Sequence, residues 1–209
     1  MRARMPGVTL VVTLLLASLP AVLAAKDKYQ DETARLTSLM HWAKGDVVAE
    51  IGAGEGQMSF DAAKRVGSTG HVYATELDDQ KLAHLKDETA DGHFQNVTIV
   101  KAGTEDTNLP ANCCNNIFTR RVYHHFTDPK AIDASLFRNL KPGGMLALID
   151  FPPSKGLPAV PGVPANRGGH GVPESIMTDE LKTAGFEIIS VQRGWPENDY
   201  VVLARKPAR

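Results

Sequence analysis

Short apolar segments rich in β-branched residues alternate with helical segments along most of this chain, and this alternation strongly restricts its fold. The segments with strand character cover residues 46–51, 71–77, 96–103, 115–120 and 145–151. The last of them, "MLALIDF", is apolar throughout, as expected for a strand that is buried on both faces. Strands separated by helices of this length form a parallel sheet with helices on both faces. The sequence therefore predicts an α/β fold with a Rossmann-like, mostly parallel sheet.

Apolar residues at helical spacing predict the helices that connect these strands. The helices are expected at 31–43, 58–67, 78–92, 128–144 and 174–185, and the fourth ends in a Pro-Gly-Gly turn. Before the last helix, residues 152–173 are rich in proline and glycine and are predicted to form a long loop. After it, two strand-like runs flank "WPEND", which is hairpin spacing, so the sheet is expected to end in an antiparallel pair.

The composition is typical of a soluble globular domain: 209 residues, 43% hydrophobic and 22% charged, with a formal net charge of −1. A chain of this length can bury a sizeable core as one domain. Its near-neutral charge creates no field that would attract nucleic acid or an anionic membrane, so neither is predicted as a partner. The only cysteines, Cys113 and Cys114, are adjacent and lack zinc-site spacing. No metal site is predicted, and both cysteines are expected to be free thiols.

The first 25 residues differ from the rest of the chain. Two arginines precede an apolar run over residues 8–19, and Val22 and Ala24 suit the −3 and −1 positions of a signal peptidase site. This is the layout of a secretory signal, and the run is shorter than the roughly 20 residues that span a bilayer. The sequence predicts a signal peptide at 1–25 and one domain at 26–209, with the mature protein secreted or periplasmic and not stably inserted in a membrane. The alternative is an uncleaved N-terminal segment that anchors the protein.

Three glycines at alternate positions, Gly52, Gly54 and Gly56, lie between the first strand and a helix. Glycine at this density indicates a backbone that closely approaches a ligand. A Walker phosphate loop is excluded because no Gly-Lys-Ser/Thr follows. The dinucleotide fingerprint requires a third glycine where this chain has Gln57, and Glu50 beside the loop would repel a pyrophosphate but attract an ammonium group. A nicotinamide-dependent oxidoreductase is therefore disfavoured.

Further acidic residues follow the second and third strands. Glu76 ends the second strand, where its carboxylate could accept two hydrogen bonds from a ribose. Glu105 and Asp106 follow the third strand and could reach an exocyclic amine such as that of adenine. A cationic cofactor that contains ribose and adenine but no phosphate fits all of these acids. The predicted cofactor is therefore S-adenosylmethionine.

Five segments, in this order and spacing, resemble the class I S-adenosylmethionine-dependent methyltransferases: VVAEIGAGEG, VYATEL, AGTEDTNLP, RRVYHHFTDP and LKPGGMLALIDF. The chain is similar to the small-molecule group that includes the ubiquinone and menaquinone C-methyltransferases, and the resemblance covers residues 26–205. It implies a seven-stranded sheet with an antiparallel last strand. The chain departs from the pattern at Gly103, where many relatives have aspartate, and at Cys114 and Asn115, where Phe-Asp is usual.

The resemblance also implies which residues bind the cofactor. They follow the carboxyl ends of the first four strands, where ligands bind in such folds. The methionine and ribose end is lined by Glu50, Gly52, Ala53, Gly54 and Gly56. The ribose is held by Glu76, and Leu77 packs on the adenine. The edge of the adenine is contacted by Thr104 and Glu105, and Arg120 lies near the methionine.

Methyl transfer is an in-line displacement in which the enzyme aligns the nucleophile and excludes water, and a general base is needed only for some acceptors. Tyr123, His124 and His125 follow the fourth strand and are the candidate catalytic residues, whereas Asp150 could be a cap at the end of the fifth. The loop 152–173 is predicted to set specificity. We expect an exported methyltransferase that acts on an unidentified small-molecule acceptor. The alternative is a protein of the same fold that binds S-adenosylmethionine or a nucleoside without catalysis.

Overall fold

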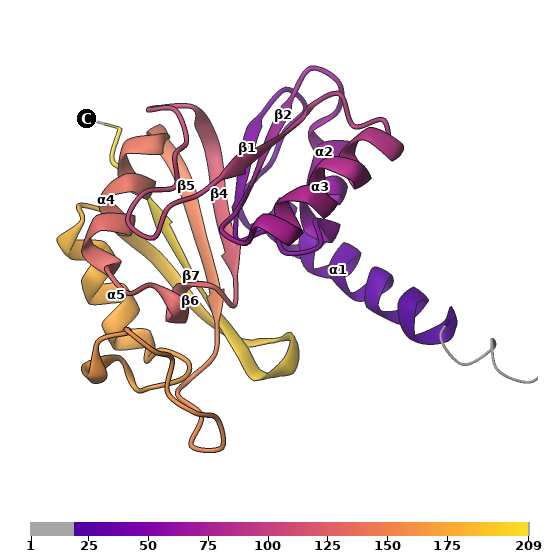
Figure 1. Cartoon of the computed structure of the whole chain (residues 1–209). Coiled ribbons are helices and arrows are strands. Elements are labelled where there is room, and N and C mark those ends of the chain that lie inside the picture. The colour runs from indigo at the N-terminus through magenta and orange to yellow at the C-terminus, as the bar shows by residue number, and fades with distance from the viewer. Residues whose placement is uncertain (1–18, 209) are drawn as a thin grey trace, which may run out of the picture.

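The computed structural model describes residues 19–208, which form one seven-stranded sheet with helices on both faces (Figure 1). The strand order is β3-β2-β1-β4-β5-β7-β6, and β7 runs antiparallel to both of its neighbours. The predicted fold class is therefore confirmed. The strands are β1 (Val47–Ile51), β2 (His71–Glu76), β3 (Val97–Lys101), β4 (Cys114–Arg120), β5 (Leu140–Asp150), β6 (Glu187–Trp195) and β7 (Asp199–Arg205).

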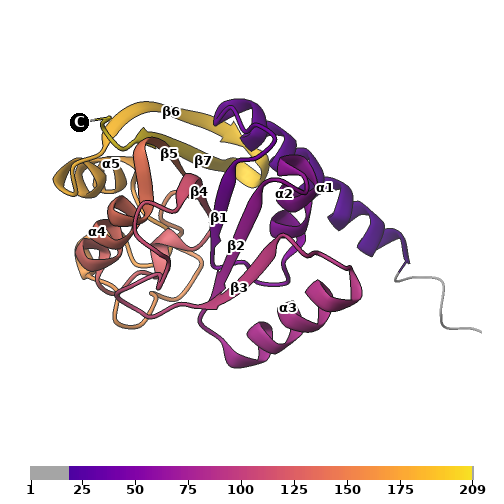
Figure 2. The ribbon, with the colours of Figure 1, turned by 90° about the horizontal axis from the view of Figure 1, so that it is seen from above.

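Two hydrophobic cores lie on opposite faces of the sheet. Figure 2 shows the helices α1 to α3 on one face and α4 and α5 on the other. The first core lies beneath α1 to α3 and the second beneath α4 and α5. Successive residues of β1 point to opposite faces, so Val48 enters the first core and Ala49 the second, and both are fully buried. The helices are α1 (Leu19–Leu39), α2 (Gln57–Val66), α3 (Asp79–Asp91), α4 (Pro129–Asn139) and α5 (Glu174–Thr183).

The carboxyl ends of the central strands are level with one another. Ile51 of β1 pairs with Thr75 of β2 on one side and with Thr119 of β4 on the other. Helices α3 and α4 start directly at this edge, each capped by an aspartate: Asp78 accepts hydrogen bonds from two backbone N–H groups, and Asp128 accepts one. The sheet therefore presents the loops after β1, β2 and β4 together.

The helix predicted at 128–144 is too long. Helix α4 ends at Asn139, and the Pro-Gly-Gly segment belongs to the start of β5. Proline disfavours helical backbone at the residue before it, Lys141, and Gly143 and Gly144 exchange backbone hydrogen bonds with Lys206 after β7. Tertiary pairing therefore makes this turn part of the sheet.

Helix α1 begins earlier than the predicted helix at 31–43. It starts at Leu19, so the predicted boundary between residues 25 and 26 falls within it, whereas residues 1–18 of the predicted signal peptide lie outside the described residues. No helix within residues 19–208 has both the length and the apolar content that crossing a bilayer requires. The C-terminal half of α1 packs on the sheet through Leu36, and Met40, directly after the helix, is buried in the same core.

The prediction that Cys113 and Cys114 are free thiols is wrong, because the two residues form a disulfide. Within a strand, adjacent side chains point to opposite faces and their sulfur atoms could not meet. Cys113, however, precedes β4, and the preceding Asn112 has left-handed backbone (φ 50°). The pair thus lies in the turn that enters β4, at the edge of the sheet opposite the loops described above.

Candidate functional site

The carboxyl ends of β1, β2 and β4 surround a cavity of about 410 Å³, here called the main cavity. Its position matches the rule that ligands of open α/β sheets bind outside the carboxyl ends of the strands. The residues that line it come from the four segments at and after the ends of β1, β2, β3 and β4, and from helix α4. They are Ile51, Gly52, Gly54, Glu76, Leu77, Lys81, Ala102, Gly103, Thr104, Thr107, Arg120, Arg121, Val122, His125, Phe126, Thr127 and Ile132.

The three glycines after β1 have different structural roles, although all three adopt a left-handed backbone conformation. A Cβ atom on Gly52 would lie 2.5 Å from Val122, and one on Gly56 would lie 2.6 Å from both Leu85 and Phe60. These two glycines allow the loop to pack against the protein itself. A Cβ atom on Gly54 would meet nothing within 4 Å, although Gly54 lines the main cavity. Only Gly54 therefore keeps space open for a ligand.

Glu76, at the end of β2, is held in a fixed position by backbone N–H groups. Its Oε1 accepts hydrogen bonds from the backbone of Leu77 (2.7 Å) and Asp78 (3.2 Å), and its Oε2 accepts one from Gly54 (3.0 Å). A carboxylate oxygen has two lone pairs, so Oε2 can accept a further hydrogen bond from a ligand hydroxyl. The neighbouring Leu77 is 50% exposed and offers an apolar surface beside this acceptor. Both features suit a ribose with an attached base.

Glu50 does not line the main cavity. Its side chain is buried beneath the glycine loop, where the Ser59 hydroxyl donates a hydrogen bond to its Oε2 (2.5 Å). Burial raises the pKa of Glu50 to about 8, so without a ligand it carries a proton at neutral pH. The sequence argument treated Glu50 as a carboxylate that attracts an ammonium group. In the ligand-free protein it is instead a neutral, buried hydrogen-bond partner of α2.

This proton predicts how stability depends on pH. Unfolded, Glu50 titrates near its ordinary value of 4.5, whereas in the folded protein it keeps its proton to about pH 8. The folded state therefore binds more protons than the unfolded state between these two pH values. The contribution of Glu50 to the free energy of unfolding falls as pH rises, by up to about 1.4 kcal/mol per pH unit. Denaturant unfolding at pH 5, 6, 7 and 8 should show a smaller fall for Glu50→Gln than for the wild type. Equal falls would contradict the assignment.

Arg120 ends β4, Arg121 directly follows it, and both belong to a group of charges that we call the charge ring. Arg120 donates two hydrogen bonds to the buried Glu32 of α1, the shorter at 2.5 Å, and its guanidinium lies 5.1 Å from the ring of Tyr29. Arg121 donates two hydrogen bonds of 2.8 Å to the buried Asp199. Glu197, in the turn between β6 and β7, contacts Lys28 and both arginines.

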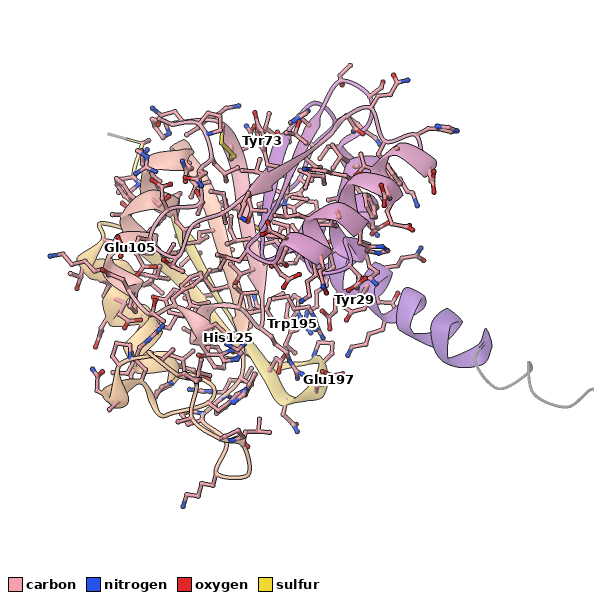
Figure 3. The ribbon with its side chains drawn as sticks, viewed as in Figure 1. Tyr29, Tyr73, Glu105, His125, Trp195 and Glu197 are labelled. Atoms are coloured by element: carbon pink, nitrogen blue, oxygen red, sulfur yellow. A yellow bond between two sulfur atoms is a disulfide. The ribbon has the colours of Figure 1, made fainter. Side chains whose placement is uncertain are left out.

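The charge ring joins three segments that are distant in sequence. Figure 3 shows Tyr29 and Glu197 where α1 meets the β6–β7 turn. Its members are three cations and three anions, so their charges balance. They are Lys28, Arg120 and Arg121, and Glu32, Glu197 and Asp199.

The loop after β3 contributes its backbone and small side chains to the main cavity. Gly103 and Thr104 line it, but Glu105 is exposed and outside the lining (Figure 3). Asp106 binds Arg138 and Ser135 instead, and this hydrogen bonding and ion pairing hold the pKa of Asp106 below its ordinary range. The acid predicted to meet an adenine amine is thus not supplied by this loop as it stands.

The turn Tyr123–His125 places its three predicted catalytic residues in three different environments. Tyr123 is fully buried, and its hydroxyl lies 2.9 Å from both Asp133 and Glu180. Burial raises the pKa of Asp133 to about 7, so that carboxyl holds a proton to share in this group. Tyr123 therefore belongs to the core, and its predicted catalytic role is not supported.

His124 is also buried, but it is tied to the end of β5. Asp150 accepts hydrogen bonds from the backbone N–H of His124 (3.0 Å) and from its Nδ1 (2.9 Å). The Nε2 of His124 is buried and has no hydrogen-bond partner within residues 19–208. His125 is exposed and lines the main cavity, with its ring centroid 4.0 Å from that of His124. His125 is nevertheless partly shielded from water, and this partial burial, together with the neighbouring His124, holds the pKa of His125 below its ordinary value.

The structure thus brings together part of the predicted site. Gly52, Gly54, Glu76, Leu77, Thr104, Arg120 and His125 line the main cavity, whereas Glu50, Ala53, Gly56, Glu105, Tyr123 and His124 do not. Sequence reasoning missed the acids of the charge ring, for which the chain offers no local motif. It also left the part of Asp150 open, and the structure shows this residue as the cap that fixes His124.

Comparison with known proteins agrees with this geometry. A family model described as a methyltransferase domain matches residues 43–181, which include every residue of the main cavity. The ubiquinone/menaquinone biosynthesis C-methyltransferase UbiE of Psychromonas ingrahamii is 31% identical over 109 residues, 52% of this chain. The match covers 43% of that relative, so the chain corresponds to less than half of its length.

Solved structures share the fold. A SAM-dependent methyltransferase from Aquifex aeolicus matches with a TM-score of 0.71 at 22% identity, over 83% of this chain and 89% of that one. The [4+2]-cyclase SpnF also matches with a TM-score of 0.71, at 16% identity over 86% and 82% of the two chains. The family model accounts for most of the chain and for the whole cavity, and it confirms the resemblance at the level of the family. The chain therefore belongs to the class I S-adenosylmethionine-dependent methyltransferases, with S-adenosylmethionine as the methyl donor.

Proposed function

We propose that this protein transfers a methyl group from S-adenosylmethionine to a small-molecule acceptor, with the donor in the main cavity. The observation that carries the proposal is the combination, in one cavity, of the open backbone at Gly54, the oriented carboxylate of Glu76 and the accessible imidazole of His125. UbiE relatives support a small acceptor. Because the chain corresponds to less than half of such a relative, the identity of that acceptor is not carried over.

The residues present fit the donor. Glu76 would accept from the ribose, Leu77 would pack on the adenine, and the Gly54 backbone with Arg120 would bound the methionine end. Bound there, S-adenosylmethionine supplies an activated methyl group on a sulfonium sulfur. The charge ring ties α1 and the β6–β7 turn to the end of β4, which helps to exclude water from this end of the cavity.

His125 is the proposed proton acceptor for an acceptor molecule that must lose a proton. Its lowered pKa keeps the imidazole neutral at pH 7, which is the form a general base requires. Asp150 and His124 are proposed as positioning residues, because their hydrogen bonds fix the turn from which His125 faces the cavity. His124 itself has no access to the cavity and is not assigned a catalytic step.

A second candidate function is binding of S-adenosylmethionine or a related nucleoside without methyl transfer. One observation favours keeping it: the same fold occurs in SpnF, whose described activity is that of a [4+2]-cyclase. If the protein is exported, as proposed below, the donor would also have to reach it outside the cytosol. Calorimetric titration of the protein with S-adenosylmethionine, S-adenosylhomocysteine and NAD tests the cofactor. Transfer of labelled methyl groups from S-adenosylmethionine to a component of a small-molecule cell extract then distinguishes a methyltransferase from a protein that only binds the cofactor. Binding of NAD in place of S-adenosylmethionine would refute both.

Export remains part of the proposal. It rests on the arrangement of arginines, apolar run and small residues within residues 1–25. Fractionation of cells that express the full chain, beside cells that express residues 26–209, tests it. We expect the full chain in the exported fraction at the size of residues 26–209, and the shortened chain in the cytosol. A full chain found in the cytosol at its full size would refute export, and one found in the membrane fraction would favour the anchored alternative.

A further inference from the structure

A second cavity of about 410 Å³ opens next to the main cavity, and we call it the loop cavity. One wall comes from the loop that follows β5 and the other from the turn between β6 and β7, two segments that lie at the same end of the molecule (Figure 1). Arg121 lines both cavities. The loop cavity is therefore placed where a second ligand would lie beside a ligand in the main cavity.

The wall after β5 is mostly apolar. It is formed by Phe151, Pro152, Pro153 and Leu157 together with Ser154, and the Arg121 guanidinium lies 5.3 Å from the ring of Phe151. Leu157 is 47% exposed and adds a large apolar side chain to this wall. Such a surface gains free energy when an apolar ligand covers it.

This wall is formed before any ligand binds. Val172 donates a backbone hydrogen bond to Phe151 (3.0 Å), and His170 accepts one from Ser154 (2.8 Å), so the loop pairs with itself. At Gly171, a Cβ atom would lie 2.7 Å from the carbonyl oxygen of Pro152, so the close approach requires glycine. The fully buried Arg167 also donates a hydrogen bond to the carbonyl of Phe126 (2.8 Å), which ties the loop to the turn that carries His125.

The opposite wall is polar but has no excess of either charge. Glu197 lines it and is neutralised by Arg121 and Lys28 within the charge ring. Arg121 contacts Asp199 through Nε and Nη2 and Glu197 through Nη2, so its Nη1, which has no hydrogen-bond partner among residues 19–208, can donate to a polar group of a ligand. The Arg121 guanidinium and the Glu197 carboxylate that line this cavity are 2.8 Å apart, so a charged ligand would meet both signs together and no fixed charge is favoured.

We propose that the loop cavity is the acceptor site, and that it selects a compact, uncharged molecule with an apolar body and one protic group. The apolar body lies against Phe151, Pro153 and Leu157, and the protic group points past Arg121, which lines both cavities, into the main cavity that His125 lines. This inference rests on the proposed function, because it names the class of acceptor. Binding alone can test it, without knowledge of the natural acceptor.

The test uses three probes that share a 4-ethylphenyl body: uncharged 4-ethylphenol, anionic 4-ethylbenzoate and cationic 4-ethylbenzylammonium. Each is titrated into the ¹⁵N-labelled protein saturated with S-adenosylhomocysteine, and backbone amide shifts are followed by NMR. We expect saturable shifts at Ser154 and Leu157 with 4-ethylphenol, and affinities lower by about tenfold or more for both charged probes, because each charge must be desolvated without a matching partner.

Two variants provide a matched comparison. Leu157→Asp and Ile189→Asp each place a charge at an exposed apolar residue, 47% and 46% exposed, but Ile189 lies on the edge strand β6, away from both cavities. Leu157→Asp should weaken 4-ethylphenol about tenfold or more, whereas Ile189→Asp should leave it unchanged. Tighter binding of a charged probe, shifts elsewhere in the fold, or equal effects of the variants would overturn the proposal.

The proposed function is tested separately by calorimetry with S-adenosylhomocysteine. If the protein does not bind S-adenosylhomocysteine, the proposed function fails, but titration of 4-ethylphenol into the ligand-free protein still reports on the loop cavity. If S-adenosylhomocysteine binds and 4-ethylphenol does not reach Leu157, the assignment of the acceptor site fails alone.

Discussion

Replacement of Gly54 by valine is expected to abolish binding of S-adenosylmethionine while the protein remains folded. Gly54 has a φ of 57°, and a Cβ atom there would meet no protein atom within 4 Å, so the new side chain would occupy the main cavity itself. The backbone of Gly54 also donates a hydrogen bond to Glu76, so displacement of the loop would disturb the ribose site. We expect the Kd for the donor to rise about 100-fold or more, equivalent to about 2.8 kcal/mol.

Gly143→Val is the matched control for Gly54→Val. Gly143 also has a positive φ, 78°, and open space at its Cβ, but it lies in the turn at the start of β5, at the other edge of the sheet. Both substitutions incur the cost of left-handed backbone in a residue with a side chain, about 1–2 kcal/mol. Calorimetric titration with S-adenosylmethionine and thermal unfolding measure the two effects. Unchanged donor affinity in Gly54→Val, or equal loss in Gly143→Val, would show that Gly54 does not border the donor.

The strands could be predicted from the sequence because burial on both faces forces a continuous apolar run, as in residues 145–150 of β5. Boundaries that depend on tertiary pairing could not. The Pro-Gly-Gly segment has the local character of a helix end, yet it belongs to β5 because Gly143 and Gly144 pair with Lys206. Similarly, nothing local distinguishes free thiols at Cys113 and Cys114 from the disulfide that the turn into β4 permits.

The lining of the main cavity was partly predictable because it is built from the ends of consecutive strands. Gly54 and Glu76 each follow a strand directly, and parallel pairing brings those ends to one edge. Glu50 shows the limit of this reasoning. Its position beside the loop was correct, but its burial and hence its protonation depend on packing against α2, which sequence spacing does not reveal.

The charge ring could not be predicted for a related reason. Glu32 lies 88 residues before Arg120, and Asp199 lies 78 residues after Arg121. Buried carboxylates of this kind are identified only by the partner that neutralises them, and the partners meet only when α1 and the β6–β7 turn reach the end of β4. The same holds for Asp150, whose hydrogen bonds to His124 explain its burial.

The three residues of the turn Tyr123–His125 show how neighbours in sequence can acquire unrelated parts. A 3₁₀ turn rotates about 120° per residue, so three successive side chains point in three directions. Tyr123 enters the core between α4 and α5, His124 faces Asp150, and His125 reaches the main cavity. Sequence could place the group at the correct edge of the sheet, but only the turn geometry distinguishes its members.

This geometry leads to the second large expected effect. His125→Gln should lower kcat for methyl transfer by about 10²- to 10⁴-fold if the acceptor must lose a proton, because glutamine cannot take that proton. Folding should be unaffected, since the His125 side chain is exposed, and the donor Kd should change little. In the wild type, kcat should rise with pH through a value below the ordinary pKa of histidine, 6.5, and then level off, because burial and His124 favour the neutral imidazole.

His71→Gln is the control for the loss of an imidazole with a lowered pKa. Burial also lowers the pKa of His71, but this residue begins β2 at the opposite edge of the sheet and does not line the main cavity. The His71→Gln variant should retain both kcat and the rise of kcat with pH on the acidic side of the profile. The His125→Gln variant should lose this rise together with the rate. A His125→Gln enzyme whose small residual rate kept the same rise would exclude His125 as the titrating base. A variant with the wild-type rate would mean that the acceptor's nucleophile needs no base.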